Sequence, residues 1–280
     1  MDLTHTSMEQ NGDFTNPKLP LYHNTRTILG LYDLVVSFKT NPCTHNCNFC
    51  EASKRSKINR ISDMELVAQV DFLFDHYANE RLKIQRVTVR NESSVLDGRT
   101  FYYGVLREVI KYTCSMPNLK EVSLETRMEY VTKPRIERIL EQLSPSVVLD
   151  ITTGFETQDE RILNMVLNKG LNRRTFEKSV QSLGQFSGRT KLTAYVMLKP
   201  DPSMTEEAGV EEAVKSVDYL QDLTQRAGVN LVVYVNPTYA APGSRLFREM
   251  QRVKYQPPTK ESLQRVMDYA KEKGVMAYTD

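Results

Sequence analysis

Three of the four cysteines in this chain of 280 residues stand close together, at Cys43, Cys47 and Cys50. Thiolates are soft ligands that suit zinc, copper(I) and iron–sulfur clusters. Three of them in one loop can hold three corners of a metal assembly and leave one position open. The fourth cysteine, Cys114, lies far along the chain. This distribution is not typical of a disulfide framework, and it indicates a metal site in a reducing compartment.

Two kinds of metal site are open for this loop. His45 lies between the first two cysteines, so a Cys3His zinc site is the alternative to an iron–sulfur cluster. Structural zinc sites usually join ligand pairs from distant segments, whereas these cysteines span only eight residues, which favours the cluster. Phe49 directly precedes the third cysteine. An aromatic side chain there can shield a cluster or cover a bound cofactor, and ordinary packing is the other interpretation.

The elements that must position this loop follow a regular rhythm. Short apolar runs rich in Val, Ile, Leu and Thr predict strands at 32–40, 83–91, 119–126, 145–154, 190–200 and 229–238. Amphipathic stretches between them predict helices at 63–77, 101–113, 133–143, 158–167, 172–184, 206–227 and 259–273. Near-continuous apolar character in several strands is typical of a parallel sheet that is buried on both faces.

This alternation implies right-handed βα units, arranged as a partial barrel or a doubly wound sheet. In a barrel, chemistry gathers where strands end and loops begin. The cysteine loop begins where the first predicted strand ends, so this rule points to it. Residues 1–30 fall outside the rhythm and are expected to form an N-terminal extension, with the barrel domain over 31–280.

Composition excludes several other classes. The N-terminus is polar and shows no signal peptide, and no window is apolar enough for a membrane span, so we expect a cytoplasmic protein with no membrane partner. The net charge of +2 does not by itself indicate nucleic acid. No basic tail or recognisable RNA-binding appendage is present.

The loop C-x3-C-x2-C, with an aromatic residue before its third cysteine and a place after the first strand of a βα-repeat domain, resembles the radical S-adenosylmethionine superfamily. The resemblance implies a partial (β/α)6 TIM-like barrel. It also implies that Cys43, Cys47 and Cys50 ligate three irons of a [4Fe-4S] cluster, which takes His45 out of the ligand set. S-adenosylmethionine would bind the fourth iron, and its reductive cleavage would give a 5′-deoxyadenosyl radical.

Other strand ends resemble one branch of that superfamily. SLETRMEYVT (123–132) is similar to the ETRPD segment of the elongator catalytic subunits. GFETQDERILNMVLNKG (154–170) is similar to the GLET…NKG segment of a group that contains the radical subunit of archaeosine synthase. KLTAYVMLKPDPSMTEEAGV (191–210), VNPTYAAPGS (235–244) and YQPP (255–258) also resemble that second group.

The resemblance also suggests residues that contact S-adenosylmethionine. The stretch RNESSVLD (90–97) replaces the usual glycine-rich segment, so Asn91, Glu92 or Ser93 would meet the ammonium group. Comparison with oxygen-independent coproporphyrinogen oxidases suggests cofactor roles at the positions Glu125, Glu156 and Lys169, with Lys169 standing where that family has arginine. Arg127 would pair with Glu125 or meet a carboxylate. Lys199 and Asn236 would contact adenine or substrate, and ordinary surface ion pairing is the alternative for the charged side chains.

The remaining expectations concern partners. Lys54, Arg55, Lys57 and Arg60, in the run SKRSKINR, would bind phosphates or attract an acidic electron donor such as flavodoxin or ferredoxin, or form a solvated loop. Cys114 is expected to be a buried small hydrophobe. A compact chain favours a small-molecule substrate, and the family analogy keeps modification of a tRNA base or its precursor as the alternative. A non-enzymatic zinc-binding interaction module is the third hypothesis.

Overall fold

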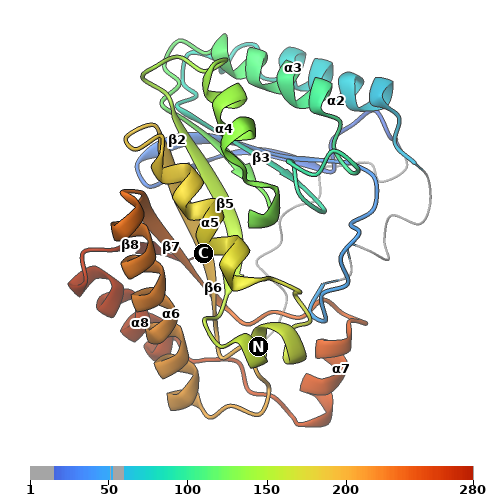
Figure 1. Cartoon of the computed structure of the whole chain (residues 1–280). Coiled ribbons are helices and arrows are strands. Elements are labelled where there is room, and N and C mark those ends of the chain that lie inside the picture. Colours follow the sequence, from blue (N-terminus) through green and yellow to red (C-terminus); the bar gives the residue numbers. More distant parts are fainter. Residues whose placement is uncertain (1–15, 51, 53–59, 280) are drawn as a thin grey trace.

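The sheet is the frame of the molecule. The computed structural model describes residues 16–50, 52 and 60–279, and in these it contains an eight-stranded curled sheet in the order β1 to β8 (Figure 1). The strands are Tyr22–Ile28 (β1), Leu31–Phe38 (β2), Arg86–Asn91 (β3), Glu121–Glu125 (β4), Val148–Glu156 (β5), Thr190–Leu198 (β6), Asn230–Pro237 (β7) and Met276–Tyr278 (β8). β2 to β8 run parallel and β1 is antiparallel to β2. The predicted partial barrel is thus confirmed, with its six strands as β2 to β7.

Helices pack along the outer face of this sheet (Figure 1). They are Asp63–His76 (α2), Tyr103–Cys114 (α3), Lys133–Leu140 (α4), Arg173–Gly184 (α5), Glu206–Ala227 (α6), Arg245–Arg252 (α7) and Lys260–Glu272 (α8). A short 3-10 turn, Met128–Tyr130 (η1), and a π-helical turn, Ile162–Val166 (η2), complete the set. α7 stands apart from this row, beside the end of the cysteine loop (Figure 1).

Local signals explain where the helices begin. Ser62 caps α2 through a capping box with Glu65. Thr205 caps α6, and Gly228 ends it with a positive φ of 69°. The predicted helix at 158–167 is instead mostly the π-helical turn η2. The carbonyl of Val166, the last residue of this turn, accepts a hydrogen bond from the cysteine loop.

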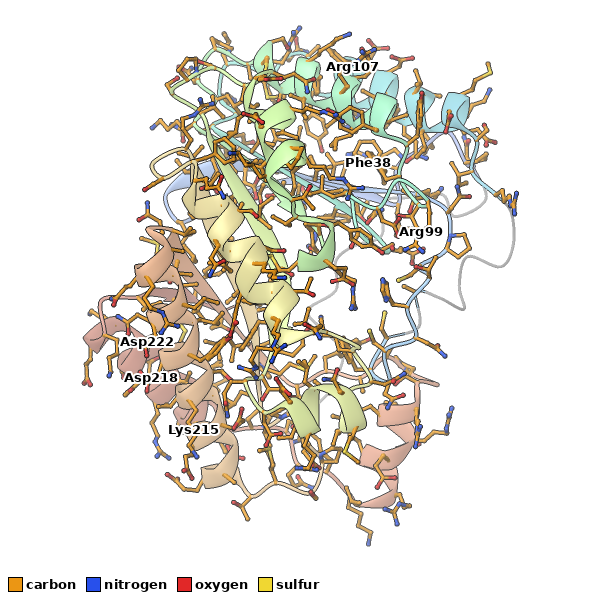
Figure 2. The ribbon with its side chains drawn as sticks, in the orientation of Figure 1. Phe38, Arg99, Arg107, Lys215, Asp218 and Asp222 are labelled. Carbon is orange, nitrogen blue, oxygen red and sulfur yellow. The ribbon has the colours of Figure 1, made fainter. Side chains whose placement is uncertain are left out.

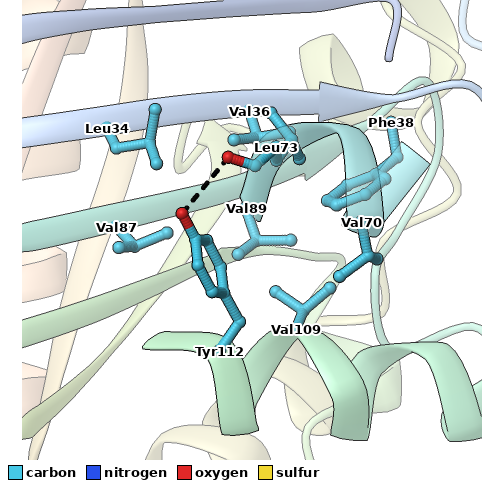
Figure 3. A pocket seen from close by; sticks show the side chains of 9 residues that line it. All are labelled: Leu34, Val36, Phe38, Val70, Leu73, Val87, Val89, Val109 and Tyr112. Carbon is cyan, nitrogen blue, oxygen red and sulfur yellow. Dashed lines mark hydrogen bonds between the residues drawn. The ribbon is translucent and has the colours of Figure 1, made fainter. Parts of the chain in front are cut away.

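The main hydrophobic core lies between the sheet and the outer helices. A void of about 10 Å³ remains in it, between β2 and β3 on one side and α2 and α3 on the other (Figure 3). Tyr112 Oη donates to the carbonyl of Leu73 at 3.2 Å beside this void. Its lining is apolar and it holds at most about one water, so it belongs to the core and is no ligand site.

Two predictions about single elements need correction or extension. Cys114 is exposed rather than buried, because it ends α3 on the side away from the sheet, where its Sγ donates to the carbonyl of Gln142 at 3.2 Å. β1, from the N-terminal stretch, adds an antiparallel strand to the sheet. The domain boundary at residue 30 stays a prediction.

Candidate functional site

The cysteine loop starts directly after β2 and is held from two other strand ends. Asn48 N donates to Leu167 O at 2.8 Å, and Asn48 Nδ2 donates to Val166 O at 2.7 Å. These carbonyls belong to the turn that follows β5. From the segment after β7, Ala241 N donates to Phe49 O and Leu246 N donates to Asn48 O, both at 2.8 Å. The loop is therefore fixed at the carboxyl end of the barrel by segments that are far from it in sequence.

The three cysteines of this loop differ in burial. Cys43 and Cys47 are half-buried and Cys50 is exposed. Backbone N–H groups point at two of the sulfurs: His45 N lies 3.5 Å from Cys43 Sγ, and Ala52 N lies 3.3 Å from Cys50 Sγ. Hydrogen bonds to thiolate sulfur are one way in which a protein tunes an iron–sulfur cluster. The donor set therefore fits a three-legged cluster.

Charged side chains lie near the Cys47 thiol. Burial raises the pKa of its thiol, while the nearby cations Lys169 and Arg127 act in the opposite direction. Arg127 Nη1 lies 4.0 Å from Cys47 Sγ. Among the described residues, no three His, Cys, Asp or Glu side chains converge on one point as a single metal ion requires. A cluster places each thiolate on a different iron, so it does not need such convergence.

His45 makes other contacts. Its Nε2 lies 3.2 Å from Tyr130 Oη and 3.7 Å from a Glu129 carboxylate oxygen. Arg99 Nη2 donates to the same Tyr130 Oη at 2.6 Å, so Arg99 borders this side of the loop (Figure 2). Burial and the charge of Arg127 lower the pKa of His45. These contacts engage the imidazole with a tyrosine and a carboxylate.

Glu156 and Lys169 come together beside the loop. Lys169 Nζ lies 2.5 Å from Glu156 Oε1, both residues are buried, and the same Nζ lies 5.7 Å from the centre of the Phe49 ring. A Cβ atom on Gly154 would lie 2.1 Å from Glu156 Oε1 and 2.4 Å from Lys169 Nζ. The ion pair thus occupies the space that a side chain at position 154 would fill, and such a side chain would displace it. Phe49 also packs on a second apolar cluster that includes Met197. This contact is compatible with ordinary packing and with covering a bound cofactor.

Arg127 joins three parts of the site. Its Nη2 donates to the carbonyl of Lys169 at 2.8 Å, and its Nε pairs with Glu129 at 2.5 Å. Its backbone N–H donates to Ser94 Oγ at 2.9 Å. Arg127 was expected to pair with Glu125 or to meet a carboxylate. It pairs with the Glu129 carboxylate, whereas Glu125 pairs with Arg90.

The end of β3 and the segment after it contain two buried polar side-chain atoms without a hydrogen-bond partner among the described residues. Asn91 Oδ1 accepts from Ser93 N at 3.0 Å, while Asn91 Nδ2 and Ser93 Oγ are buried without a hydrogen-bond partner among the described residues. Glu92 between them is half-buried. Buried polar groups are normally satisfied, so these atoms suit a polar ligand. Ser93 Oγ can accept from an ammonium group, as expected, whereas Asn91 Nδ2 is a donor and suits a ligand oxygen.

Glu125 ends β4 and takes part in a group that sequence reasoning missed. Arg90 Nε donates to Glu125 Oε2 at 2.6 Å, and Tyr195 Oη donates to the same oxygen at 3.3 Å. The charge of Glu125 raises the pKa of Arg90. The signal for Arg90 and Tyr195 was the period-2 alternation of their strands, which places polar side chains opposite the apolar outer face.

Curated relatives match most of the chain at low identity. A search with protein-family models finds no match. The chain is 22% identical over 250 residues to an uncharacterized protein of Methanocaldococcus jannaschii, covering 87% of this chain and 66% of that protein. It is 25% identical over 187 residues to archaeosine synthase subunit beta of Thermococcus kodakarensis, covering 67% of this chain and 55% of that subunit. The chain thus spans between about half and two thirds of the length of these relatives.

Solved structures give the fold. Escherichia coli coproporphyrinogen III oxidase HemN, described as a radical SAM enzyme, matches with a TM-score of 0.52 at 12% identity, over 86% of this chain and 52% of HemN. Streptococcus suis SuiB, solved with its precursor peptide SuiA, matches with a TM-score of 0.55 at 11% identity, over 89% of this chain and 48% of SuiB.

The chain has the fold of a radical S-adenosylmethionine enzyme.

The resemblance to the radical S-adenosylmethionine superfamily and its archaeosine synthase and elongator branch is confirmed by these relatives and by the fold. Within this fold, two further predicted cofactor contacts lie at the ends of β6 and β7. Lys199 is buried, with its Nζ 2.9 Å from Gln256 O and 3.4 Å from Glu206, beside the Tyr255 ring. Asn236 is half-exposed near the end of β7, in register with Met197.

Other expectations for the radical S-adenosylmethionine fold concern its surroundings. Lys54, Arg55 and Lys57 lie outside the described residues, and Arg60 is exposed. None of the helices in the described part of the chain has the length and apolar character that a membrane crossing needs.

Proposed function

We propose that this chain is a radical S-adenosylmethionine enzyme that holds a [4Fe-4S] cluster on Cys43, Cys47 and Cys50. The observation that carries the proposal is the three-thiol loop itself. It lies at the carboxyl end of a partial barrel, and hydrogen bonds from the segments after β5 and β7 hold it there. That edge is where barrel enzymes place their chemistry.

With cluster and S-adenosylmethionine bound, the pair would supply reductive cleavage of the sulfonium to methionine and a 5′-deoxyadenosyl radical, which takes hydrogen from the substrate. The protein's part is to bind, orient and exclude water. We propose that the side-chain oxygens of Asn91, Glu92 and Ser93 accept hydrogen bonds from the ammonium group, since Ser93 Oγ is buried without a partner among the described residues. Phe49 would cover the cofactor.

The charged residues around the loop have two roles in this proposal. Arg127 and Lys169 would balance the negative charge of thiolates and cluster, with Glu129 and Glu156 setting their positions. Lys199 and Asn236 would meet adenine or substrate farther along the rim. An acidic donor such as flavodoxin or ferredoxin would deliver the electron.

For the substrate, the relatives favour the RNA alternative. Two of them are archaeosine synthase beta subunits, from Thermococcus kodakarensis and Methanosarcina acetivorans. We therefore propose a tRNA base or its precursor as the first substrate class, ahead of the small molecule that the compact chain suggested. The zinc-binding module is the last alternative, and the contacts of His45 with Tyr130 and Glu129 weigh against its fourth ligand.

The test is anaerobic reconstitution with iron and sulfide, followed by reduction in the presence of S-adenosylmethionine. We expect a brown protein that forms methionine and 5′-deoxyadenosine. Cys47→Ala should lose both colour and product, whereas Cys114→Ala, at the exposed end of α3, should keep both. A colourless protein that retains zinc and leaves S-adenosylmethionine intact would contradict the proposal.

A further inference from the structure

The concave face of the sheet carries a polar group that the cofactor contacts do not use. Arg90 from β3, Glu125 from β4 and Tyr195 from β6 meet there, through bonds of 2.6 Å between Arg90 Nε and Glu125 Oε2 and of 3.3 Å between Tyr195 Oη and the same oxygen. Arg90 Nη2 lies 3.5 Å from Tyr195 Oη. Because β5 lies between β4 and β6, these contacts cross the interior of the barrel.

This group is partly open to solvent. Val87 and Val89 of β3 point to the helices, so Arg90, which follows in alternation, points to the concave face. β3 and β4 are inner strands, yet the side chains of Arg90 and Glu125 remain 21% and 25% exposed. Both residues lie at the carboxyl ends of their strands, Arg90 one residue before the end of β3 and Glu125 at the end of β4, so a ligand can reach them from that edge of the sheet.

The register places this group just below the cofactor region. Glu125 pairs with Thr152, and Tyr195 pairs with Gly154. The Glu156–Lys169 ion pair lies directly against Gly154, and Lys169 faces Phe49. Along β5 the order is thus Thr152, Gly154 and then the ion pair beside the cysteine loop. A molecule bound to the group would lie next to whatever the loop and ion pair hold.

The chemistry of the group defines what it can recognise. The bonds of Glu125 with the described residues use Oε2, which leaves Oε1 as an acceptor, and Arg90 has N–H donors beyond those in its two contacts. The cation and the carboxylate neutralise each other, so a charged ligand would meet a like charge. A neutral group with an N–H beside a C=O matches both.

Aromatic side chains packed edge to face lie beside this group. The rings of Tyr195 and Tyr234 lie 5.2 Å apart at 81°, and those of Tyr234 and Tyr278 lie 4.6 Å apart at 80°. Burial and the charge of Glu125 raise the pKa of Tyr195, so its hydroxyl stays protonated at neutral pH. Such rings favour a planar ligand packed against them.

We propose that Arg90, Glu125 and Tyr195 form a substrate subsite that binds a neutral planar carboxamide or lactam. The inference rests on the proposed function, since it names the chemical class of the substrate of the same barrel. It gives Glu125 a role in substrate binding in place of the expected contact with S-adenosylmethionine.

The test compares benzamide with benzoate, which share a ring and differ in the polar group. Each is titrated against the reconstituted full chain by ligand-observed NMR. We expect saturable binding of benzamide and weaker binding of benzoate. Glu125→Gln should weaken benzamide binding by about tenfold, because it removes a charged hydrogen-bond acceptor. Tyr195→Phe, which removes only a hydroxyl, should weaken it by a smaller factor and serves if the first variant does not fold.

Glu177→Gln is the matched control. Glu177 accepts a bond from Tyr219 Oη at 2.8 Å, between α5 and α6 on the outer face, and its replacement should leave benzamide binding unchanged. Tighter binding of benzoate than of benzamide, or equal benzamide binding in the wild type and both subsite variants, would overturn the proposal. So would loss of S-adenosylmethionine binding in Glu125→Gln with benzamide binding intact.

Cleavage of S-adenosylmethionine, measured on the same preparations without benzamide, separates the two proposals. If the chain binds benzamide as expected but does not cleave S-adenosylmethionine, the proposed function fails while the subsite stands. If it cleaves S-adenosylmethionine but does not bind benzamide, only the subsite fails.

Discussion

Lys169 and Glu156 are opposite charges that the fold encloses almost completely. Their side chains are 9% and 6% exposed, and their charged atoms are 2.5 Å apart. Glu156 also has a positive φ of 70°, an unusual conformation for a residue with a side chain. Strain of this kind persists where surrounding contacts hold it, and here the partner is the lysine beside the cysteine loop.

Replacing one partner of this pair should be costly. Lys169→Met leaves the Glu156 carboxylate buried without its cation, and we expect a loss of roughly 3–5 kcal/mol in the free energy of unfolding. Urea denaturation of the cluster-free chain measures it. The control is Lys215→Met, since Lys215 pairs with Glu211 on the exposed face of α6 (Figure 2) and should matter little. Equal, small losses in both variants would show that the Glu156 site is already well hydrated.

Sequence reasoning selected Glu156 and Lys169 separately and did not predict that they pair. Their contact depends on a shift in strand register between Gly154 and Glu156 and on the π-helical turn that brings Lys169 back. Neither feature has a reliable short-range signal. The three cysteines could be identified from the sequence because they lie in one short loop. Arg90 and Tyr195 become neighbours only when β3, β4 and β6 assemble into the sheet.

At the scale of elements, the packing of α6 on the end of β6 depends on Gly209. A Cβ atom there would lie 2.8 Å from Lys199 Cβ and 3.1 Å from Lys199 Cα. Lys199 has a positive φ of 65° and lies directly beneath the helix. The glycine thus sets how closely the helix approaches the strand end.

Gly209→Ala tests two opposing effects. Alanine favours a helix over glycine by up to about 1 kcal/mol, while overpacking costs typically about 1–3 kcal/mol. Since the clash is with backbone and Cβ, we expect net destabilisation, seen as a lower melting temperature. Gly98→Ala, where nothing lies within 4 Å of the added atom, should change it little. A higher melting temperature for Gly209→Ala would show that α6 can shift freely.

The contact between β1 and α2 should make stability depend on pH. His23 Nδ1 lies 2.8 Å from Tyr77 Oη, and burial followed by the charge of His76 lowers the pKa of His23. The unfolded chain then takes up a proton at higher pH than the folded chain. Stability should therefore fall as pH drops through about 6.5 towards the folded pKa. Melting temperatures at pH 7.5 and 5 should differ less in His23→Gln than in the wild type, and an equal difference would contradict this account.

The elements themselves were predicted unevenly. Six strands and most helices follow from apolar periodicity, and their ends agree within a few residues. β1 (YHNTRTI) and α7 (RLFREMQR) were missed, because each has too few apolar residues for a clear period. In α7 only Leu246 and Met250 are buried, with Ser244 as a cap. Its place is set by the cysteine loop, which a local pattern does not reveal.

At the scale of the whole molecule, the RNA alternative makes an electrostatic prediction. Binding of tRNA to a protein releases counterions from contacted phosphates, so affinity falls steeply as salt rises. We expect a tRNA gel shift that weakens between low and physiological salt, although the net charge is only +2. A matched mixture of free nucleosides should compete poorly. Absence of a complex at low salt, together with tight binding of a small ligand, would return the substrate to the metabolite class.

The overall class of the fold was within reach of the sequence, because alternating strands and helices leave few topologies. The contacts that hold the cysteine loop at the end of the barrel could not be predicted from the sequence. Asn48 and Phe49 are held by hydrogen bonds to residues 166–167 and 241–246. These contacts form only when the sheet has curled.

That dependence has a consequence for the order of events during synthesis. The cysteines leave the ribosome early, but the last of the loop's backbone donors, Leu246 N, follows about 200 residues later, which is roughly 10–40 s at common rates of translation. During that interval the thiols belong to a loop without its anchors. Assembly of the proposed cluster into the held loop would thus be a late step in the maturation of this chain, and iron delivered earlier would meet an unformed site.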